Sequence, residues 1–459
     1  MIQNRNEILE TVERYNVTGP RYTSYPTAVQ FTESFDHETL DRALERRGGE
    51  VQDLSLYFHI PFCFSLCWYC GCTKIITRDQ DRGDVYLDYL AKEINLVKQT
   101  IHPKSTVRQV HFGGGTPTFL TPVQLRRLGA LINNGFNIHE DVEFSVEIDP
   151  RRCGEEHIIA LREIGCNRAS LGVQDTNPDV QEAIHRIQPF SITCMVTELL
   201  RKHGISEINF DLIYGLPRQT SFTFNQTIDD VIRLDPDRLA VYSYAHLPAL
   251  MPAQKLLSED ELPSPREKLE MMMAAVERFP EMGYRFIGMD HFAKEEDELS
   301  IALDQGTLQR NFQGYSTHSG LEMIAFGMSG ISQGDDLYYQ NEKDLARYYE
   351  DLEEGRLPVK KTLFLSEDDK IRRDVIMQIM CQATIRFETF REKTGFHFKE
   401  YFSAEIEKLQ PMEADGFLLV MDDQLIIREK GRLFLRNIAM TFDWHLSQKR
   451  GYANYSKTV

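Results

Sequence analysis

Six short runs rich in β-branched and aromatic residues alternate with longer segments of helical periodicity, beginning near residue 54. This alternation predicts parallel strands joined by crossover helices. Helical candidates lie between the runs, for example at 84–100, 121–134 and 155–165. The runs are SLYFHI (55–60), VRQVHF (107–112), VEFSVEI (142–148), RASLGVQ (168–174), EINFDLIYG (207–215) and RLAVYSY (238–244).

Chemically suggestive residues stand at or just after the C-terminal ends of several of these runs. Active sites of parallel βα barrels lie at that end of the strands, so the pattern favours a barrel over a doubly wound sheet. The predicted fold class is α/β, a partial or full parallel βα barrel with an N-terminal arm and a small C-terminal domain. We place the arm at 1–50, the barrel and its extension at 51–360, and the C-terminal domain at 361–459.

The segments that flank the repeat differ from it in composition. Residues 15–28, YNVTGPRYTSYPTA, are rich in Gly, Pro, Thr and Tyr, which indicates an ordered aromatic arm. Beyond about residue 250 the alternation loosens, and the stretch 291–306 is polar. A helix that opens at Ser366 and a strand pair with Asp-Asp at its turn (416–429) predict a C-terminal α+β domain of winged-helix kind.

The charge balance excludes one class of partner. The 459 residues carry 70 acidic and 52 basic side chains, for a formal net charge of −18, whereas nucleic-acid-binding proteins need a basic surface. No window approaches the ~20 apolar residues of a membrane span. The N-terminal stretch is charged throughout and has no apolar core typical of a secretory signal. We therefore expect a cytoplasmic protein without nucleic-acid or membrane partners, and the acidic surface is compatible with a monomer.

Four of the eight cysteines fall within ten residues, directly after the first predicted strand. Cys63, Cys67 and Cys70 have the spacing Cys-x3-Cys-x2-Cys, and Cys72 follows. Three thiolates this close can hold a [4Fe–4S] cluster and leave one iron open for chemistry. A zinc site is the alternative, with Cys72 or His59 as fourth ligand, but the spacing differs from that of common zinc modules. The sequence favours an iron–sulfur cluster.

A glycine-rich motif, HFGGGTPT (111–118), follows the next strand. Successive glycines let the backbone approach a ligand closely, although a tight turn alone would also explain them. In a parallel barrel this motif and the cysteines would face the same mouth.

Together these two motifs resemble the radical S-adenosylmethionine (SAM) superfamily. Further stretches are similar to one family within it, the oxygen-independent coproporphyrinogen III oxidases (dehydrogenases) of porphyrin synthesis. The likeness runs from the N-terminal arm to the last helix. It is carried by YNVTGPRYTSYPTA (15–28), YFHIPFC (57–63), CGC (70–72), GVQD (172–175), NFDLIYGLP (209–217), YAHLP (244–248), GMDHFA (288–293) and RNFQGY (310–315).

The resemblance implies roles for individual residues. Cys63, Cys67 and Cys70 would ligate the cluster, whose open iron takes the amino and carboxylate groups of a first SAM. Four positions match those that hold this SAM: Tyr57, Gly114, Glu147 and Ile331. The family also binds a second SAM, and its matching positions are Tyr69, Gly115, Thr116, Gln174, Arg186, Asp211 and Ala245.

Cys72, Arg21 and Arg310 match none of these cofactor positions, and Asp211 needs a partner. Cys72 is not needed by a three-ligand cluster, and the resemblance places it near the substrate as a catalytic residue. The substrate has four carboxylates, so basic groups must converge on it, and Arg21 and Arg310 are the candidates. Asp211 stands in an apolar run, where an unpaired carboxylate is costly, so we expect a partner such as Arg186 or a ribose hydroxyl.

The implied reaction converts two propionate side chains of coproporphyrinogen III to vinyl groups, giving protoporphyrinogen IX. A one-electron reductant is needed for the cluster. Two alternatives are a haem-binding or haem-trafficking relative on the same scaffold, and another radical SAM enzyme that modifies porphyrins. The sequence does not identify the electron donor, the order of the two decarboxylations or the role of His291.

Overall fold

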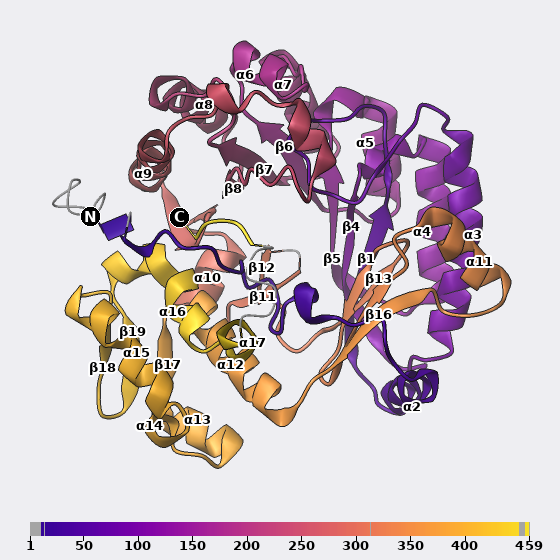
Figure 1. Ribbon diagram of the computed structural model, residues 1–459. Helices are drawn as coiled ribbons and strands as arrows, with labels where there is room; N and C mark the ends of the chain where they lie inside the picture. The colour runs from indigo at the N-terminus through magenta and orange to yellow at the C-terminus, as the bar shows by residue number, and fades with distance from the viewer. Residues whose placement is uncertain (1–10, 13, 313, 449–454, 459) are drawn as a thin grey trace.

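The computed structural model describes residues 11–12, 14–312, 314–448 and 455–458 (Figure 1). Its centre is a 12-stranded sheet in the order β16-β15-β14-β13-β1-β4-β5-β6-β7-β8-β10-β9. The strands of this sheet are β1 (Asp53–Ile60), β4 (Thr106–Gly114), β5 (Ile138–Ile148), β6 (Arg168–Gln174), β7 (Glu207–Tyr214), β8 (Arg238–Ser243), β9 (Tyr284–Gly288), β10 (His291–Lys294), β13 (Glu322–Phe326), β14 (Ile331–Gln333), β15 (Leu337–Asn341) and β16 (Val359–Phe364).

All six predicted strands are confirmed as β1 and β4 to β8, and each pairs in parallel with its neighbour. Crossover helices follow them along the chain and surround the sheet, as Figure 1 shows. Their bounds are α3 (Asp81–Lys98), α4 (Pro122–Gly135), α5 (Glu155–Glu163), α6 (Pro178–Ala183), α7 (Phe190–Lys202), α8 (Ser221–Leu234) and α9 (Pro265–Glu281). The α/β barrel prediction is therefore correct.

The barrel is partial, because β16 and β9 end the sheet without pairing with each other. β13 adds to β1 in parallel, and β14, β15 and β16 continue the sheet in antiparallel fashion. At the other edge β10 and β9 follow β8, also antiparallel. The stretch 291–306, which the sequence describes only as polar, forms β10 and the helix α10 (Glu298–Gln305).

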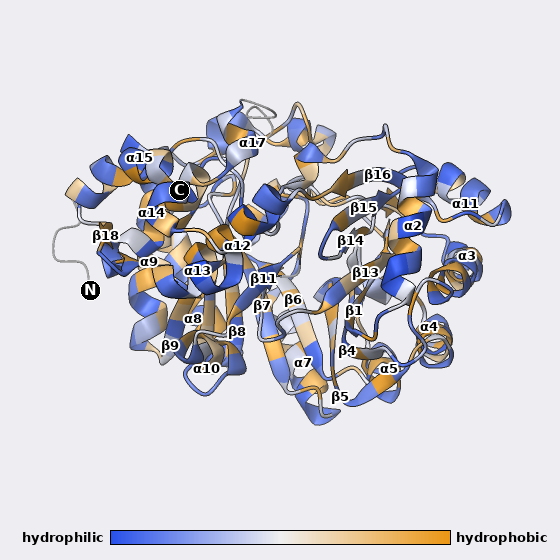
Figure 2. Ribbon diagram, turned by 90° about the horizontal axis from the view of Figure 1, so that it is seen from below, coloured by the Kyte–Doolittle hydropathy of each residue, from blue (hydrophilic) through white to orange (hydrophobic). Residues whose placement is uncertain are grey.

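Apolar residues of the strands and of the inward helix faces form the main core. It includes fully buried rings such as Phe58, Phe112 and Phe210. Figure 2 shows polar residues frequent along the surrounding helices. No helix in the described part of the chain is long and apolar enough to cross a membrane.

The C-terminal part contains a second core and a three-stranded antiparallel sheet in the order β17-β19-β18. Helices before and between these strands agree with the winged-helix-like expectation, and Ser366 caps the first by accepting from Asp369 N. The helix α11 (Leu345–Glu353) packs beside α3 on the barrel. The elements of the C-terminal part are α12 (Glu367–Gln382), β17 (Thr384–Arg386), α13 (Phe387–Thr394), α14 (Phe398–Tyr401), α15 (Ser403–Ala414), β18 (Leu418–Val420), β19 (Gln424–Ile427), α16 (Leu435–Thr441) and α17 (Trp444–Ser447).

The N-terminal arm connects both parts of the molecule. Tyr22 and Tyr25 are buried in the second core, together with barrel residues such as Ile287. Arg436 of α16 donates to Gly19 O and to Pro20 O, and α2 (His37–Gly48) then packs beside β15. In Figure 1 the indigo arm runs from the C-terminal domain towards α2. The boundary predicted at residue 360 falls inside β16, and the three-part division stays a prediction.

Candidate functional site

The cysteine loop follows β1 and is closed by a short parallel ladder. β2 (Phe62–Cys63) pairs with β3 (Ile75–Ile76), so the segment between them forms a compact loop. Trp68 anchors it, because its backbone N–H donates to Ile184 O at 3.0 Å and its ring stacks on His185 at 5.1 Å. The loop therefore holds Cys63, Cys67 and Cys70 at the C-terminal end of β1.

The sulfur environments suit thiolate ligands. Cys67 Sγ lies 3.3 Å from Arg151 Nη2 and 3.6 Å from Arg186 Nη1. The pKa of Cys70 is lowered to about 6, first by a hydrogen bond from Cys72 and then by Lys74, against the effect of burial. Burial raises the pKa of Cys63 to about 12. A bound metal would have to displace the thiol proton of Cys63, and thiols lose their proton readily when they coordinate a metal.

The same geometry does not favour the zinc alternative. In the described residues no three His, Cys, Asp or Glu side chains converge closely enough to hold a single ion. His59 is already engaged, since Nε2 lies 2.9 Å from Thr73 O and Nδ1 lies 3.1 Å from Tyr57 Oη. Cys72 is exposed. Three cysteines on one loop fit a multi-iron cluster, which is far larger than one ion.

The glycine motif lies directly against the cysteine loop. Gly115 N donates to Ile60 O at 2.8 Å and Thr116 N donates to Phe62 O at 3.0 Å. A Cβ at Gly115 would lie 2.6 Å from Phe62 O and 2.7 Å from Pro61 O, too close for any side chain. The conformation of Gly114, with φ of +113°, also favours glycine. Both positions therefore require glycine for close packing at the barrel mouth.

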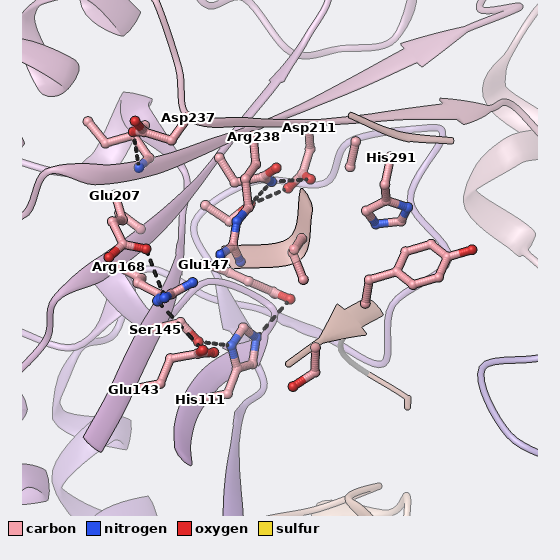
Figure 3. A pocket seen from close by; sticks show the side chains of 18 of the residues that line it. His111, Glu143, Ser145, Glu147, Arg168, Glu207, Asp211, Asp237, Arg238 and His291 are labelled. Atoms are coloured by element: carbon pink, nitrogen blue, oxygen red, sulfur yellow. Dashed lines mark hydrogen bonds and ion pairs between the residues drawn. The ribbon is translucent and has the colours of Figure 1, made fainter. Parts of the chain in front are cut away.

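Glu147 points into the barrel from the end of β5, where Figure 3 shows it beside His111. Its carboxylate lies 3.4 Å from His111 Nε2 and accepts from Gly114 N at 3.3 Å. These contacts lower the pKa of Glu147 in spite of its enclosed position. The ring of Tyr57 stacks on His111 at 5.8 Å, so three strands contribute to one corner of the site.

Ile331, also predicted for the first SAM, begins β14 after a tight loop. In that loop Ser329 Oγ lies 3.5 Å from His59 Nε2. A buried carboxylate fixes the loop, because Glu93 of α3 accepts from Gly327 N at 2.8 Å and from Asn341 Nδ2 at 2.6 Å. Ile331 thus follows a loop that contacts the end of β1.

The residues predicted for the second SAM include Tyr69 on the cysteine loop, Gly115 next to the end of β4 and Gln174 at the end of β6. Gln254 donates to Tyr69 O and to Ala245 O, each at 3.1 Å, and so joins two positions that are far apart in sequence. A Cβ at Gly172 would meet both Gln174 and Arg186, which shows that these side chains converge there.

The expected pairing of Asp211 with Arg186 is not found. Asp211 instead accepts from Ser170 Oγ at 2.7 Å and from Asn209 Nδ2 at 2.9 Å, because those residues face it from the same and the adjoining strand. Burial raises its pKa to about 6. Arg186 pairs with Asp149 at 3.3 Å. Sequence reasoning missed Asp149, although it stands just after a predicted strand end, where site residues are expected.

A cavity of about 160 Å³ occupies the barrel interior (Figure 3). Glu147, Asp211, Tyr242 and His291 line it. Arg21 reaches this region from the arm, with its guanidinium 5.3 Å from the centre of the Tyr242 ring.

Arg310 lies on the hairpin of β11 (Gln309–Asn311) and β12 (Gly314–Ser316). Its guanidinium is 4.6 Å from the centre of the Tyr315 ring. The Tyr242 and Tyr315 rings both contact His291, so the structure brings Arg21 and Arg310 to the same wall of the barrel.

Comparison with known proteins shows the family of this chain. The Radical SAM superfamily model matches residues 57–231, and the HemN C-terminal domain model matches 365–434. Oxygen-independent coproporphyrinogen III oxidase from Pseudomonas aeruginosa is 44% identical, with 95% of each chain covered. That from Escherichia coli K12 is 41% identical, with 98% of each covered. A solved structure of coproporphyrinogen III oxidase (HemN) from Escherichia coli, a radical SAM enzyme, matches with a TM-score of 0.91 at 40% identity, covering 95% of this chain and 98% of that chain.

Proposed function

This chain belongs to the oxygen-independent coproporphyrinogen III oxidases of the radical SAM superfamily, and we propose that it forms protoporphyrinogen IX from coproporphyrinogen III in haem biosynthesis. Each of two propionate side chains loses a hydrogen atom, carbon dioxide and one electron, and becomes a vinyl group. The observation that carries this proposal is the contact between the cysteine loop and the glycine loop at the barrel mouth.

The cofactors of the family are a [4Fe–4S] cluster and SAM, which when bound supply a 5′-deoxyadenosyl radical. We assign Cys63, Cys67 and Cys70 as the cluster ligands. The N–H groups of Arg151 and Arg186 lie beside Cys67 and would stabilise the negative charge of a thiolate cluster. The cavity lies inside the partial barrel, and shielding it from water would protect a radical from side reactions.

For the first SAM we propose the corner formed by Tyr57, Gly114, Glu147 and Ile331. Glu147 has a lowered pKa and is therefore ionised at neutral pH, as recognition of an ammonium group requires. Gly114 leaves the space above the strand end open for close approach of a ligand.

We propose a second SAM along Tyr69, Gly115, Thr116, Gln174, Arg186, Asp211 and Ala245. Arg186 and Asp211 supply opposite charges near one mouth, which suits a zwitterionic amino acid with a ribose. Two observations support this second site. Gln254 donates to the backbone carbonyl groups of both Tyr69 and Ala245, and the side chains of Gln174 and Arg186 both lie against Gly172.

Gly115→Ala tests this assignment. Its Cβ would press on the backbone of Pro61 and Phe62, and overpacking of this kind costs about 1–3 kcal/mol. We expect equilibrium dialysis with radiolabelled SAM to show two molecules bound to the wild type and loss of one in the variant. Gly154→Ala is the control, because a Cβ there meets nothing within 4 Å. A wild-type stoichiometry of one would contradict the second site.

We further propose that the protein acts as a monomer in the cytoplasm, with a one-electron reductant and without nucleic acid. All eight cysteines are free, which is usual in a reducing compartment. The acidic net charge disfavours a nucleic-acid partner.

Arg21 is proposed to bind the substrate, and Arg21→Ala should raise the KM for coproporphyrinogen III at least tenfold. A charge-assisted hydrogen bond to a carboxylate contributes about 1.5–3 kcal/mol, which sets this scale. Iron content should not change, because Arg21 contacts Asp290 and Tyr242 and not the cysteine loop. Arg14→Ala is the control in the same arm, since Arg14 pairs with Asp415 at the surface. Equal KM values for the Arg21 variant and the wild type would remove this role.

Two other functions on this scaffold are distinguished by product and binding. A haem-trafficking relative would retain haem and leave coproporphyrinogen unchanged, and another porphyrin-modifying radical enzyme would give a product of different mass. Anaerobic turnover with coproporphyrinogen III separates all three.

A further inference from the structure

Arg310 is a buried cation without an anionic partner among the residues that the structure describes. Its residue is 6% exposed, and its Nε and one of its Nη atoms make no hydrogen bond within the described part of the chain. Within the described part of the chain, its guanidinium lies over the face of the Tyr315 ring. A buried charge without a counter-ion is costly, so a fold does not keep one for its own stability.

A second buried arginine provides the comparison. Arg372 is 7% exposed and lies 5.3 Å from the centre of the Phe402 ring, much as Arg310 lies on Tyr315. Arg372 differs in that Asp368 and Glu405 accept from it, at 2.7 Å and 3.0 Å. The two sites therefore differ mainly in the presence of carboxylates.

Arg310 stands in a region of excess positive charge. Arg21, Arg432 and Arg436 line a neighbouring cavity of about 40 Å³, in which Asp290 is the acid among the described lining residues. Asp290 pairs with Arg21 through one oxygen, and its other oxygen lies 3.0 Å from His291 Nδ1. Arg310 is linked to this cavity through the ring of Tyr315, which it overlies at 4.6 Å and which in turn contacts the ring of His291 at 5.2 Å.

The arginine cluster, defined as Arg21, Arg310, Arg432 and Arg436, joins three parts of the chain. Arg21 comes from the arm, Arg310 from the β11–β12 hairpin, and Arg432 and Arg436 from the C-terminal domain. Tyr214 and Ser243, at the C-terminal ends of β7 and β8, line the same small cavity. The cluster thus lies at the barrel mouth, where parallel barrels bind their substrates.

One member of the cluster is structural. Arg436 donates to four backbone carbonyl groups and so holds the arm and the chain end together. Arg21 is paired with Asp290, whereas Arg310 has two nitrogen atoms without a hydrogen-bond partner among the described residues. A cavity of 40 Å³ is close to the volume of a single small polar group, given about 30 Å³ for each water in the liquid.

We propose that the arginine cluster binds propionate carboxylates of the substrate, with Arg310 as the principal anchor, and that the C-terminal domain serves to complete this carboxylate site. The proposal rests on the function proposed above. It explains why a chain with a net charge of −18 places three arginines around Asp290 in this cavity, with Arg310 linked to Asp290 through Tyr315 and His291. Guanidinium groups bind carboxylates through two parallel hydrogen bonds, which gives geometric selectivity as well as affinity.

The decisive variant is Arg310→Met, which keeps the length and removes the charge. Thermal unfolding of the substrate-free holoenzyme should occur at a midpoint equal to or higher than that of the wild type. The Kd for coproporphyrinogen III should rise at least tenfold, with iron content and SAM binding unchanged. Arg372→Met is the matched control, and it should lower the midpoint because it leaves two carboxylates without their partner.

A midpoint for Arg310→Met below that of the wild type, or its failure to fold, would mean that Arg310 is structural and would overturn the proposal. An unchanged Kd would also overturn it. Arg310→Lys keeps the charge but loses the two-pronged geometry, so its Kd should lie between those of the wild type and Arg310→Met. The tetramethyl ester of coproporphyrinogen III should bind wild type and Arg310→Met equally weakly.

The design separates this proposal from the proposed function. If wild type binds the tetracarboxylate through Arg310 but does not decarboxylate it, the binding site stands and the reaction fails. If wild type forms protoporphyrinogen while Arg310→Met retains normal affinity, the reaction stands and the carboxylate site fails.

Discussion

Replacement of Cys63, Cys67 or Cys70 by alanine is expected to remove the iron and reduce protoporphyrinogen formation to background. Three thiolates are the full protein share of a cluster that keeps one iron open, so the loss of any one leaves too few ligands. The fold should survive, because the main core is formed by strands and helices such as those around Phe58 and Phe210.

Iron and acid-labile sulfide per chain, together with circular dichroism, measure this result. Cys194→Ala is the control, since Cys194 lies on α7 and is half-buried away from the cysteine loop. A variant at Cys63, Cys67 or Cys70 that kept a full cluster would show that the ligand assignment is wrong.

Cys72→Ser should give a different result from its three neighbours. We expect the cluster and SAM binding to remain, while product formation falls by about 10²–10⁴-fold, the scale for loss of a positioned proton donor. Serine has almost the size of cysteine and keeps a hydrogen-bonding group, but it is a far weaker acid. In the structure Cys72 is exposed and forms a hydrogen bond with Cys70, so it is close to the cluster position without being enclosed.

Iron analysis and a single-turnover assay on Cys72→Ser distinguish three roles. Iron loss equal to that of Cys70→Ala would make Cys72 a ligand. Full iron and full activity would make it a bystander. Retained iron with slow turnover supports the proposed catalytic role near the substrate.

The parallel part of the fold could be predicted from local sequence. The predicted runs VEFSVEI and RASLGVQ correspond to β5 and β6, in which buried apolar residues alternate with polar residues that line the cavity. The strands β13 to β16 could not be predicted in this way. β14 has three residues, and its pairing with β15 depends on contacts that no local pattern encodes.

The site residues likewise fall into those that a local pattern reveals and those that depend on contacts between distant parts of the chain. Cysteines and glycines in a short motif are visible in sequence because their spacing is local. The partner of Arg186 is not visible, since Asp149 lies 37 residues away and meets it only through the register of the sheet. The environment of His291 likewise depends on Asp290, on rings from two separate strands, and on arginines from the arm and the hairpin.

The measurement that tests the central claim most directly is anaerobic turnover followed by mass analysis of the porphyrin. Reconstituted protein would be incubated with coproporphyrinogen III, SAM and a one-electron reductant. We expect a product that has lost two carboxyl groups and gained two vinyl groups, with 5′-deoxyadenosine and methionine formed alongside it. Unchanged coproporphyrinogen, from a preparation that holds a full cluster and cleaves SAM, would contradict the account.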